Sequence, residues 1–430
     1  MQSKDFLIRL IKDQKSEINV LLEGAIRRDK LSDLINIDSK MAIIVKGVRR
    51  SGKSTFLLEL VSSKYNQNFY YFNFDDERLI DFTLQDFQTL LEAFYQHEKL
   101  DKDVFLFDEI QNIKGWELFV NRLLRQGSKI YISGSNSDLL SAELGTHLTG
   151  RHLDFEIYPF SFKEFLDFYK YKYSKDLVLS TSEKSKILNY FNKYINMGGM
   201  PESLRSGSLA LKNIFSDIIE KDIIRRYNIR NSAKLRNLIK YILSVVPEKF
   251  SYKSIGDALK IDDEAIQKYI KYAEDTYLLF TVEKYEKKTK LLYKNQKKIY
   301  GIDNGLILAN SVNVNEQKGW LLENLVASEL KRRNKALCYY VTKNGKEVDF
   351  VTYNNLDIKK KIDYLIQVSY EINSESTRKR EESSLIEAMN ETNLKCGYII
   401  TMDYEDTKKI DSKKIEYLPA WKFLLSDKFK

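Results

Sequence analysis

The chain has 430 residues, of which 43% are hydrophobic and 30% charged, so it is not a disordered polypeptide, and its length predicts about two to four domains. Seventeen glycines, four prolines and two cysteines exclude collagen-like and disulfide-framework proteins, and no apolar run approaches a membrane span of roughly 20 residues, so we expect a soluble cytoplasmic protein. The net charge of +9 indicates either a nucleic-acid partner or a composition bias, and its distribution along the chain has to distinguish them.

Short apolar runs alternate with helical segments over the first 160 residues. Apolar positions at helical spacing predict a helical segment over residues 4–35. The next apolar runs predict strands at 41–45, 69–74, 104–107 and 129–133, separated by helices at 55–65, 84–95 and 116–124. Short apolar strands that alternate with helices are typical of a parallel sheet with both faces covered. We therefore predict an α/β fold built on a parallel sheet.

The pattern changes along the rest of the chain. A mainly helical region is followed by two short helices and a hairpin, and strands and helices then mix again up to the C-terminus. These changes predict four parts, at residues 1–165, 166–245, 246–300 and 301–430.

A glycine turn directly after the apolar run 41–45 fits the phosphate-loop pattern G-x-x-x-x-G-K-[ST]. Its residues, with the threonine that follows, are Gly47, Val48, Arg49, Arg50, Ser51, Gly52, Lys53, Ser54 and Thr55. In such a loop the backbone N–H groups point at phosphate oxygens, Lys53 reaches the β and γ phosphates, and the Ser54 hydroxyl binds Mg²⁺. The strand before it and the helix after it are the context that the pattern requires, so we predict a nucleotide site. The absence of the N-K-x-D guanine motif favours ATP over GTP.

An acidic pair ends the apolar run 104–107. Asp108 and Glu109 are expected at the carboxyl end of a strand beside the phosphate loop. Asp108 suits the coordination shell of Mg²⁺, together with Ser54, and Glu109 suits the polarisation of the attacking water. An acidic pair alone is common turn chemistry, but its place after a phosphate loop favours the catalytic interpretation.

A polar segment follows the predicted strand 129–133. Asn136, or alternatively Ser135, is placed to hold the attacking water between the acidic pair and the γ-phosphate. The cap of a following helix is the structural alternative, and it is compatible with this role.

With these motifs in place, the chain resembles prokaryotic AAA-like P-loop ATPases that carry a winged-helix segment and a C-terminal nuclease-like domain of unknown function. The matching segments are GVRRSGKST, FLFDEIQNI, YISGSNSDLLSAELGTHLTGR, IYPFSFKEF, GGMPES, KKIYGIDNGL, LLENLVASEL and GKEVDFV. The resemblance implies that the four parts are an ATPase core, a helical lid, a winged helix and a restriction-endonuclease-like α/β domain. It also implies that Arg151 is a sensor or arginine finger, acting in cis or across a subunit contact. Ordering of the loop before the next strand is the plain alternative for Arg151.

The C-terminal segments resemble the PD-(D/E)xK nuclease core. Asp349 takes the place of the first acid and Glu323 that of the auxiliary acid. Gln367 stands where the second acid belongs, and Ser369 where the lysine belongs. Because these departures weaken metal binding and remove the helper of the general base, we predict a nuclease-like fold with little or no cleavage activity.

Residues 251–280 predict a helix-turn-helix that continues into a wing. The second helix begins with the acidic residues Asp262, Asp263 and Glu264, which repel phosphate. The segment 283–300 carries seven lysines and two glutamates, so it is the candidate DNA contact. Packing of the winged helix against protein is the alternative.

These observations predict an ATP-binding, ATP-hydrolysing protein in which the nucleotide state repositions a winged helix and a degenerate nuclease-like module. The alternative is a nucleotide-dependent switch that hydrolyses ATP slowly and binds a protein partner or DNA. A homo-oligomer is a further candidate assembly, because an arginine finger can act between subunits.

Overall fold

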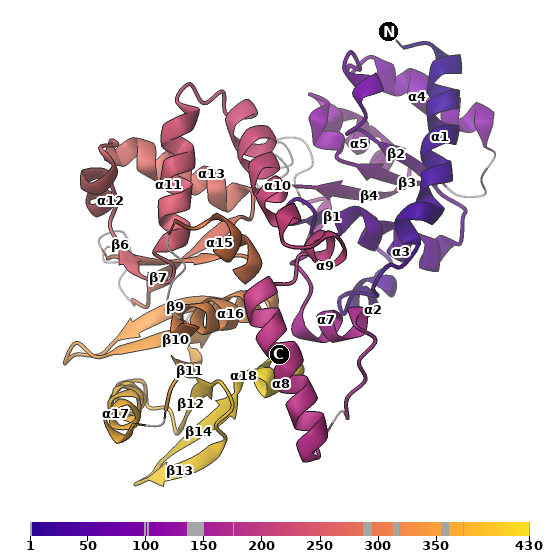
Figure 1. Ribbon diagram of the computed structural model, residues 1–430. Helices are drawn as coiled ribbons and strands as arrows, with labels where there is room; N and C mark the ends of the chain where they lie inside the picture. The colour runs from indigo at the N-terminus through magenta and orange to yellow at the C-terminus, as the bar shows by residue number, and fades with distance from the viewer. Residues whose placement is uncertain are drawn as a thin grey trace. The chain divides into compact units, whose positions relative to one another are not determined.

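The computed structural model describes residues 2–98, 100, 103–135, 150–174, 176–286, 295–312, 318–353, 361–372 and 374–429. The chain forms two compact units, whose elements are labelled in Figure 1. Unit 1 is Met1–Tyr158 with Asp275–Tyr277, and unit 2 is Pro159–Glu274 with Leu278–Lys430. None of the described helices is both long enough and apolar enough to cross a membrane.

Unit 1 contains a parallel five-stranded sheet in the order β2-β3-β4-β1-β5. The strands are β1 (Ala42–Lys46), β2 (Tyr70–Asn73), β3 (Val104–Asp108), β4 (Lys129–Gly134) and β5 (His152–Glu156). Every residue of β1 and β3 is buried, as expected for central strands covered on both faces. The predicted parallel α/β sheet is confirmed.

Helices cover both faces of this sheet. They are α1 (Lys4–Leu22), α2 (Leu31–Ile35), α3 (Lys53–Tyr65), α4 (Asp86–His97) and α5 (Trp116–Arg125), with short 3₁₀ turns η1 (Glu77–Leu79) and η2 (Ile110–Asn112). Alternate side chains of β1 enter two cores, Ile44 with α1, α4 and α5, and Ile43 and Val45 with α2 and α3. The segment predicted helical over 4–35 is two helices, because the chain turns at Gly24, whose φ is +65°.

Unit 2 begins with a helical region. Its helices are α7 (Phe162–Phe168), α8 (Thr181–Met197), α9 (Pro201–Ser206), α10 (Leu209–Asp217), the π-helical η3 (Ile218–Arg225), α11 (Ser232–Ser244), α12 (Tyr252–Leu259), α13 (Asp263–Asp275), α15 (Asn304–Asn310), α16 (Lys318–Arg332), α17 (Glu375–Thr392) and α18 (Ala420–Leu425). Capping boxes start α7 at Ser161 and α8 at Ser180, each closed by a glutamate three residues later.

A mixed nine-stranded sheet completes unit 2, in the order β13-β14-β12-β11-β10-β9-β7-β8-β6. Its strands are β6 (Lys249–Phe250), β7 (Leu279–Lys284), β8 (Lys297–Gly301), β9 (Ala336–Val341), β10 (Glu347–Tyr353), β11 (Ile362–Ser369), β12 (Cys396–Thr401), β13 (Asp406–Ile410) and β14 (Lys413–Pro419). β7 pairs in parallel with β9, so the β6–β8 strands and the C-terminal strands share one sheet. The expected division at residue 300 therefore falls within a continuous sheet, and the four-part division stays a prediction.

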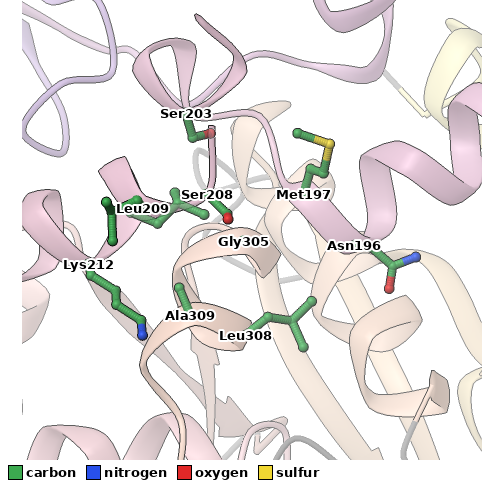
Figure 2. Close-up of a pocket in the computed structure, with 10 residues that line it drawn as sticks. Asn196, Met197, Ser203, Ser208, Leu209, Lys212, Gly305, Leu308 and Ala309 are labelled. Atoms are coloured by element: carbon green, nitrogen blue, oxygen red, sulfur yellow. The ribbon is translucent and has the colours of Figure 1, made fainter. Parts of the chain in front are cut away.

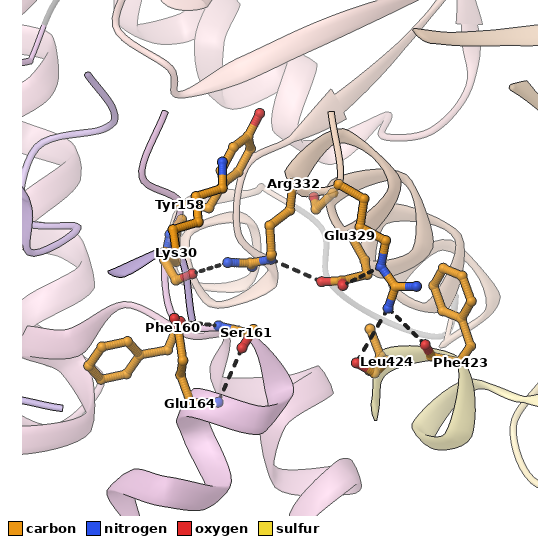
Figure 3. A network of polar contacts seen from close by, with 12 residues as sticks. Lys30, Tyr158, Phe160, Ser161, Glu164, Glu329, Arg332, Phe423 and Leu424 are labelled. Carbon is orange, nitrogen blue, oxygen red and sulfur yellow. Dashed lines mark hydrogen bonds and ion pairs between the residues drawn. The ribbon is translucent and has the colours of Figure 1, made fainter. Parts of the chain in front are cut away.

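Contacts from distant parts of the sequence hold the first residues of unit 2 (Figure 3). Arg332 donates from Nη1 to the carbonyl of Pro159 at 2.6 Å, and the N–H of Phe160 donates to the carbonyl of Gly199 at 2.7 Å. Glu329 orients Arg332 through an ion pair of 2.9 Å. These bonds fix the start of unit 2 to α16 and to the turn before α9.

The GGMPES segment forms that turn because only glycine fits at its first two positions. A Cβ on Gly198, whose φ is +71°, would lie 2.1 Å from Asp303 Oδ1, and one on Gly199 would lie 2.2 Å from the Phe160 carbonyl oxygen. The buried Asp303 carboxylate accepts the Gly199 N–H at 2.6 Å. Burial raises the pKa of Asp303 to about 6.

Candidate nucleotide-binding site

Three strands of unit 1 end side by side at the carboxyl edge of the sheet. β4 lies between β1 and β3, with Lys46 in register with Gly134, and Asp108 with Ser133. The phosphate loop, the acidic pair and the segment after β4 therefore meet at one edge. This is the edge where open α/β sheets bind ligands.

The phosphate loop has the backbone that its glycines predict. Gly47 has a φ of +151°, and a Cβ there would lie 2.1 Å from the carbonyl oxygen of Ile157. Gly52, with a φ of +92°, is the N-cap of α3, so Lys53 and Ser54 form its first turn. The loop thus ends on a helix N-terminus, whose unpaired N–H groups and dipole favour a phosphate.

Ser54 and Asp108 are brought together beside Lys53. Ser54 Oγ donates to Asp108 Oδ1 at 3.0 Å, and Ser133 Oγ donates to the same oxygen. Burial raises the pKa of Asp108, although the two hydroxyls and Lys53 oppose this shift. A hydroxyl and a carboxylate in contact are oxygen ligands of the kind that Mg²⁺ takes together with phosphate oxygens and water, so the predicted pair fits this ion.

Lys53 is almost fully buried and its Nζ donates to the Val48 carbonyl at 3.1 Å. The loop therefore folds back over its own lysine. A backbone carbonyl is a neutral acceptor, so a phosphate oxygen can replace it with a stronger, charge-assisted partner.

Glu109 follows Asp108 in a left-handed conformation with a φ of +52°. Its N–H donates to the carbonyl of Ser133 at 3.2 Å. Its Oε2 accepts from Gln111 Nε2 at 2.5 Å, and Ser135 Oγ lies 3.4 Å from the same oxygen. The predicted alternative Ser135 thus touches Glu109, whereas Asn136 lies outside the described residues. A non-glycine residue at positive φ is strained, which indicates that the fold holds Glu109 in place.

Two residues that contact this site, Gln111 and Arg28, were not predicted from the sequence. Gln111 lies in the 3₁₀ turn after Glu109, and the spacing of two residues is its only local signal. Arg28 is buried, and it donates from Nη1 to the Ser51 carbonyl at 2.8 Å and from Nη2 to the Tyr158 carbonyl at 2.5 Å. Arg28 therefore ties the phosphate loop to the end of unit 1, and nothing in the N-terminal sequence marks it.

Of the three arginines that were predicted as site residues, Arg49 and Arg50 lie in the phosphate loop and Arg151 lies away from it. Arg49 Nη1 lies 3.8 Å from Asp75 Oδ2, and Arg50 has a left-handed φ of +64° within the loop. Arg151 precedes β5, and its carbonyl accepts the N–H of Ala42 at the amino end of β1. Arg151 thus starts β5 at the edge of the sheet opposite the phosphate loop, and its role as a sensor or arginine finger in cis stays a prediction. The role across a subunit contact stays a prediction.

The residues predicted from the nuclease-like core meet in unit 2 around a lysine. Asp349 on β10 and Glu323 on α16 both contact Lys298, which comes from β8. Gln367 accepts the Asp349 N–H at 3.2 Å, and Ser369 Oγ donates to the Glu371 carbonyl. Because Ser369 stands at the expected lysine position, the sequence predicts a cluster without a lysine. Lys298 of β8, outside the predicted C-terminal part 301–430, supplies one. Within the described residues, no three His, Cys, Asp or Glu side chains are arranged to hold a metal ion.

A separate cavity of about 350 Å³ opens in unit 2 between the end of α8, α9, α10 and α15 (Figure 2). Its walls are mainly apolar and small side chains, and Lys212 is the charged residue among those that line it. The described residues that line the cavity include no carboxylate, histidine or cysteine.

Three family models match successive parts of the chain. Residues 39–166 match a family described as an AAA domain. Residues 188–318 and 318–423 match two domains of unknown function, DUF8612 and DUF4143.

Among solved structures, the replication initiator DnaA bound to AMPPCP and single-stranded DNA is 18% identical, with a TM-score of 0.26, over 59% of this chain and 91% of that chain. AMPPCP-bound DnaA from Aquifex aeolicus is 17% identical, with a TM-score of 0.24, over 57% of this chain and 85% of that chain.

Two curated relatives align over almost the whole chain. "Uncharacterized protein MJ1544" of Methanocaldococcus jannaschii is 36% identical, over 92% of this chain and 92% of its own length. An uncharacterized protein of Haemophilus influenzae is 30% identical, over 92% of this chain and 98% of its own length. The chain therefore belongs to the family of these two proteins, in which it is an AAA-like P-loop protein of the ATPase class with two further domains of unknown function.

Proposed function

We propose that this protein binds ATP with Mg²⁺ at the phosphate loop of unit 1 and hydrolyses it. The observation that carries the proposal is the contact of Ser54 with Asp108, which Glu109 follows directly, at the edge where β1 and β3 end. Mg²⁺ bound with ATP supplies charge neutralisation at the β and γ phosphates. Catalysis of phosphoryl transfer rests mainly on positioning and electrostatic stabilisation, and this edge provides groups for both.

Each side chain has a distinct role in this proposal. The loop N–H groups and Lys53 bind the β and γ phosphates. Ser54 and Asp108 orient the metal ion, and Glu109 polarises the attacking water. Gln111 and Ser135, which contact the Glu109 carboxylate, set its direction.

Steady-state ATP turnover with Mg²⁺ tests this assignment. Lys53→Ala should abolish nucleotide binding, and Glu109→Gln should keep binding while turnover falls by about 10²- to 10⁴-fold, the usual contribution of a general base. The matched control is Glu77→Gln, which removes an exposed carboxylate of the same unit. Wild-type turnover in Glu109→Gln would refute the role of Glu109.

The second candidate function is a switch that hydrolyses ATP slowly. It is favoured by the 2.5 Å bond from Gln111 to Glu109, because a hydrogen bond to the charged carboxylate makes it a weaker base toward water. Gln111→Ala separates the two functions. Faster turnover in this variant indicates that Gln111 restrains Glu109, and slower turnover indicates that it positions Glu109.

We further propose that the nucleotide state repositions a winged helix and a nuclease-like module. Support comes from the order of α12, α13, β7 and β8, in which two short helices are followed by an antiparallel hairpin. α13 starts with Asp263 and Glu264, so DNA contact is assigned to the lysine-rich segment 283–300, with the exception of the buried Lys298, rather than to this helix. Lys287, Lys288 and Lys290 of that segment lie outside the described residues.

DNA affinity measured against salt concentration tests this assignment. Replacing Lys287, Lys288 and Lys290 by Gln should reduce the slope of log affinity against log salt by about one for each phosphate that the lysines no longer neutralise. An unchanged slope would show that these lysines do not contact DNA, and the net charge of +9 would then reflect composition bias.

Arg151 is proposed to complete a neighbouring subunit's site in a homo-oligomer. The test mixes Lys53→Ala with Arg151→Ala, each expected to be inactive alone. Recovered turnover in the mixture supports action between subunits, because one subunit then supplies the intact loop and the other the arginine. Full activity of Arg151→Ala alone would refute the role.

A further inference from the structure

Three carboxylates of unit 2 converge on one ammonium group. Lys298 Nζ lies 2.9 Å from Glu323 Oε1, 2.8 Å from Glu347 Oε1 and 3.3 Å from Asp349 Oδ1. The lysine side chain is only 6% exposed. Glu323 comes from α16, whereas Glu347 and Asp349 come from β10, so elements distant in sequence are assembled around this one cation.

The ammonium has no capacity left for a water molecule or a substrate. A lysine carries three N–H donors and no acceptor, and here three carboxylates receive them. Burial disfavours the charge of Lys298, but the three carboxylates outweigh burial and raise its pKa. A lysine that activates water has to release a proton or orient that water, and Lys298 is held in the arrangement least suited to either task.

The carboxylates also have partners other than Lys298. Asp349 Oδ2 accepts the N–H of Val368 at 2.9 Å, and the Tyr300 hydroxyl donates at 2.8 Å to Glu323 Oε1, the oxygen that also pairs with Lys298. The other oxygen of Glu347 pairs with Lys249. Groups of the same chain therefore stabilise each of the three buried carboxylates, as buried charges require.

A divalent cation bound by these three carboxylates would have to take the place of the ammonium, and among the described residues the carboxylates are not arranged to hold one as they lie. Mg²⁺ or Mn²⁺ binds carboxylate oxygens at about 2.0–2.2 Å, and an ammonium takes distances of about 2.8–3.3 Å, so the carboxylates would have to close by about 1 Å on a metal ion. Both cations would occupy the same space and neutralise the same charges.

We propose that unit 2 carries a built-in cation: the Lys298 ammonium takes the place of a divalent metal among Glu323, Glu347 and Asp349, and the site binds no metal as long as that lysine is present. This inference is independent of the proposed ATP hydrolysis in unit 1. It predicts that removal of one positive charge turns a structural ion cluster into a metal site.

Binding of Mn²⁺ to the nucleotide-free full-length chain tests the inference, with free Mn²⁺ measured by electron paramagnetic resonance. Wild type should show no Mn²⁺ site that depends on Asp349. Lys298→Met, which keeps the side-chain length and removes the charge, should gain one Mn²⁺ site at least tenfold tighter than any in wild type. The double variant Lys298→Met, Asp349→Asn should lose the gained site.

Lys249→Met is the matched control, because it removes the other lysine that pairs with Glu347 while Lys298 stays in place. This control should gain no Mn²⁺ site, and an equal gain would overturn the specific role of Lys298. A folded Lys298→Met without added affinity would also overturn the inference. If Lys298→Met does not fold, Lys298→Gln replaces it. The wild-type measurement needs no lysine variant: Mn²⁺ binding or Mn²⁺-dependent DNA cleavage that Asp349→Asn abolishes would refute the inference.

Discussion

Both units place a buried lysine beside carboxylates, but the two lysines have opposite surroundings. In unit 1, Lys53 donates to a neutral backbone carbonyl, and Asp108 is satisfied by the hydroxyls of Ser54 and Ser133. In unit 2, Lys298 is enclosed by three carboxylates. Neutral partners are readily exchanged for a phosphate or a metal ion, whereas a charge enclosed by opposite charges is costly to displace. The residue types alone therefore do not identify a binding site.

The largest expected effect is that the two lysines differ in what they support: Lys298 should matter more for stability, and Lys53 more for ATP turnover. Lys298→Met leaves three carboxylates without their main counter-ion, and the loss of one partner of a buried ion pair costs about 3–5 kcal/mol. Lys53→Met removes a charged donor from the Val48 carbonyl, which costs about 1.5–3 kcal/mol. Hydrogen exchange read by mass spectrometry measures the two losses of stability locally, in the β10 amides for Lys298→Met and in the α3 amides for Lys53→Met.

For ATP turnover, Lys53→Met should have the larger effect and Lys298→Met the smaller one. Lys53→Met should be inactive, and Lys298→Met, measured below its melting temperature, should stay within about twofold of wild type because it leaves the phosphate loop intact. If both variants lose stability and turnover in parallel, the contrast between the two lysines is refuted.

The next effect concerns two glycines with left-handed backbones, one in each unit. Gly47→Ala places a Cβ 2.1 Å from the Ile157 carbonyl oxygen, so we expect a loss of about 2–4 kcal/mol in addition to lost nucleotide binding. Gly345, with a φ of +82°, has open space around it, so Gly345→Ala should cost only about 1 kcal/mol. Urea unfolding compares the two, and equal losses would contradict the steric explanation.

A smaller effect is expected at Arg28, which braces the phosphate loop by two bonds to backbone carbonyls. Hydrogen bonds from charged groups contribute about 1.5–3 kcal/mol, so Arg28→Met should weaken ATP binding by about tenfold through a loosened loop. Arg27→Met, at the neighbouring position, is the control. Titration with ATP measures the affinities, and unchanged affinity in Arg28→Met would show that the loop keeps its shape without the brace.

The smallest effect is the pH dependence of unit 2. Burial, together with the Asp349 charge, raises the pKa of Glu323 to about 7, although Lys298 opposes the shift. A raised carboxyl pKa means that the folded state binds the proton more tightly, so stability should fall as pH rises from about 4.5 to 7. Asp303, with a pKa of about 6, acts in the same direction.

Glu323→Gln should remove the Glu323 part of this fall in stability over that range, while the Asp303 contribution remains. Urea unfolding at a series of pH values measures the difference. An identical slope in Glu323→Gln and wild type would show that Glu323 does not take up the proton.

The sequence by itself determined the parts of this protein that depend on short-range order. The parallel sheet followed from apolar runs that alternate with helices. The phosphate loop followed from nine consecutive residues. Asp108 and Glu109 followed because strand ends of a parallel sheet meet at one edge.

Only the tertiary structure decided the contacts made across long stretches of chain. Arg28 reaches Ser51 and Tyr158 from the N-terminal segment, and Lys298 reaches Asp349 from another strand pair, with no local pattern to mark either. Arg151 lies at the far edge because the direction of β5 places its first residue away from the phosphate loop. Hydrophobic periodicity reports which face of an element is buried, but a buried charge is positioned by whichever partner the whole fold brings to it.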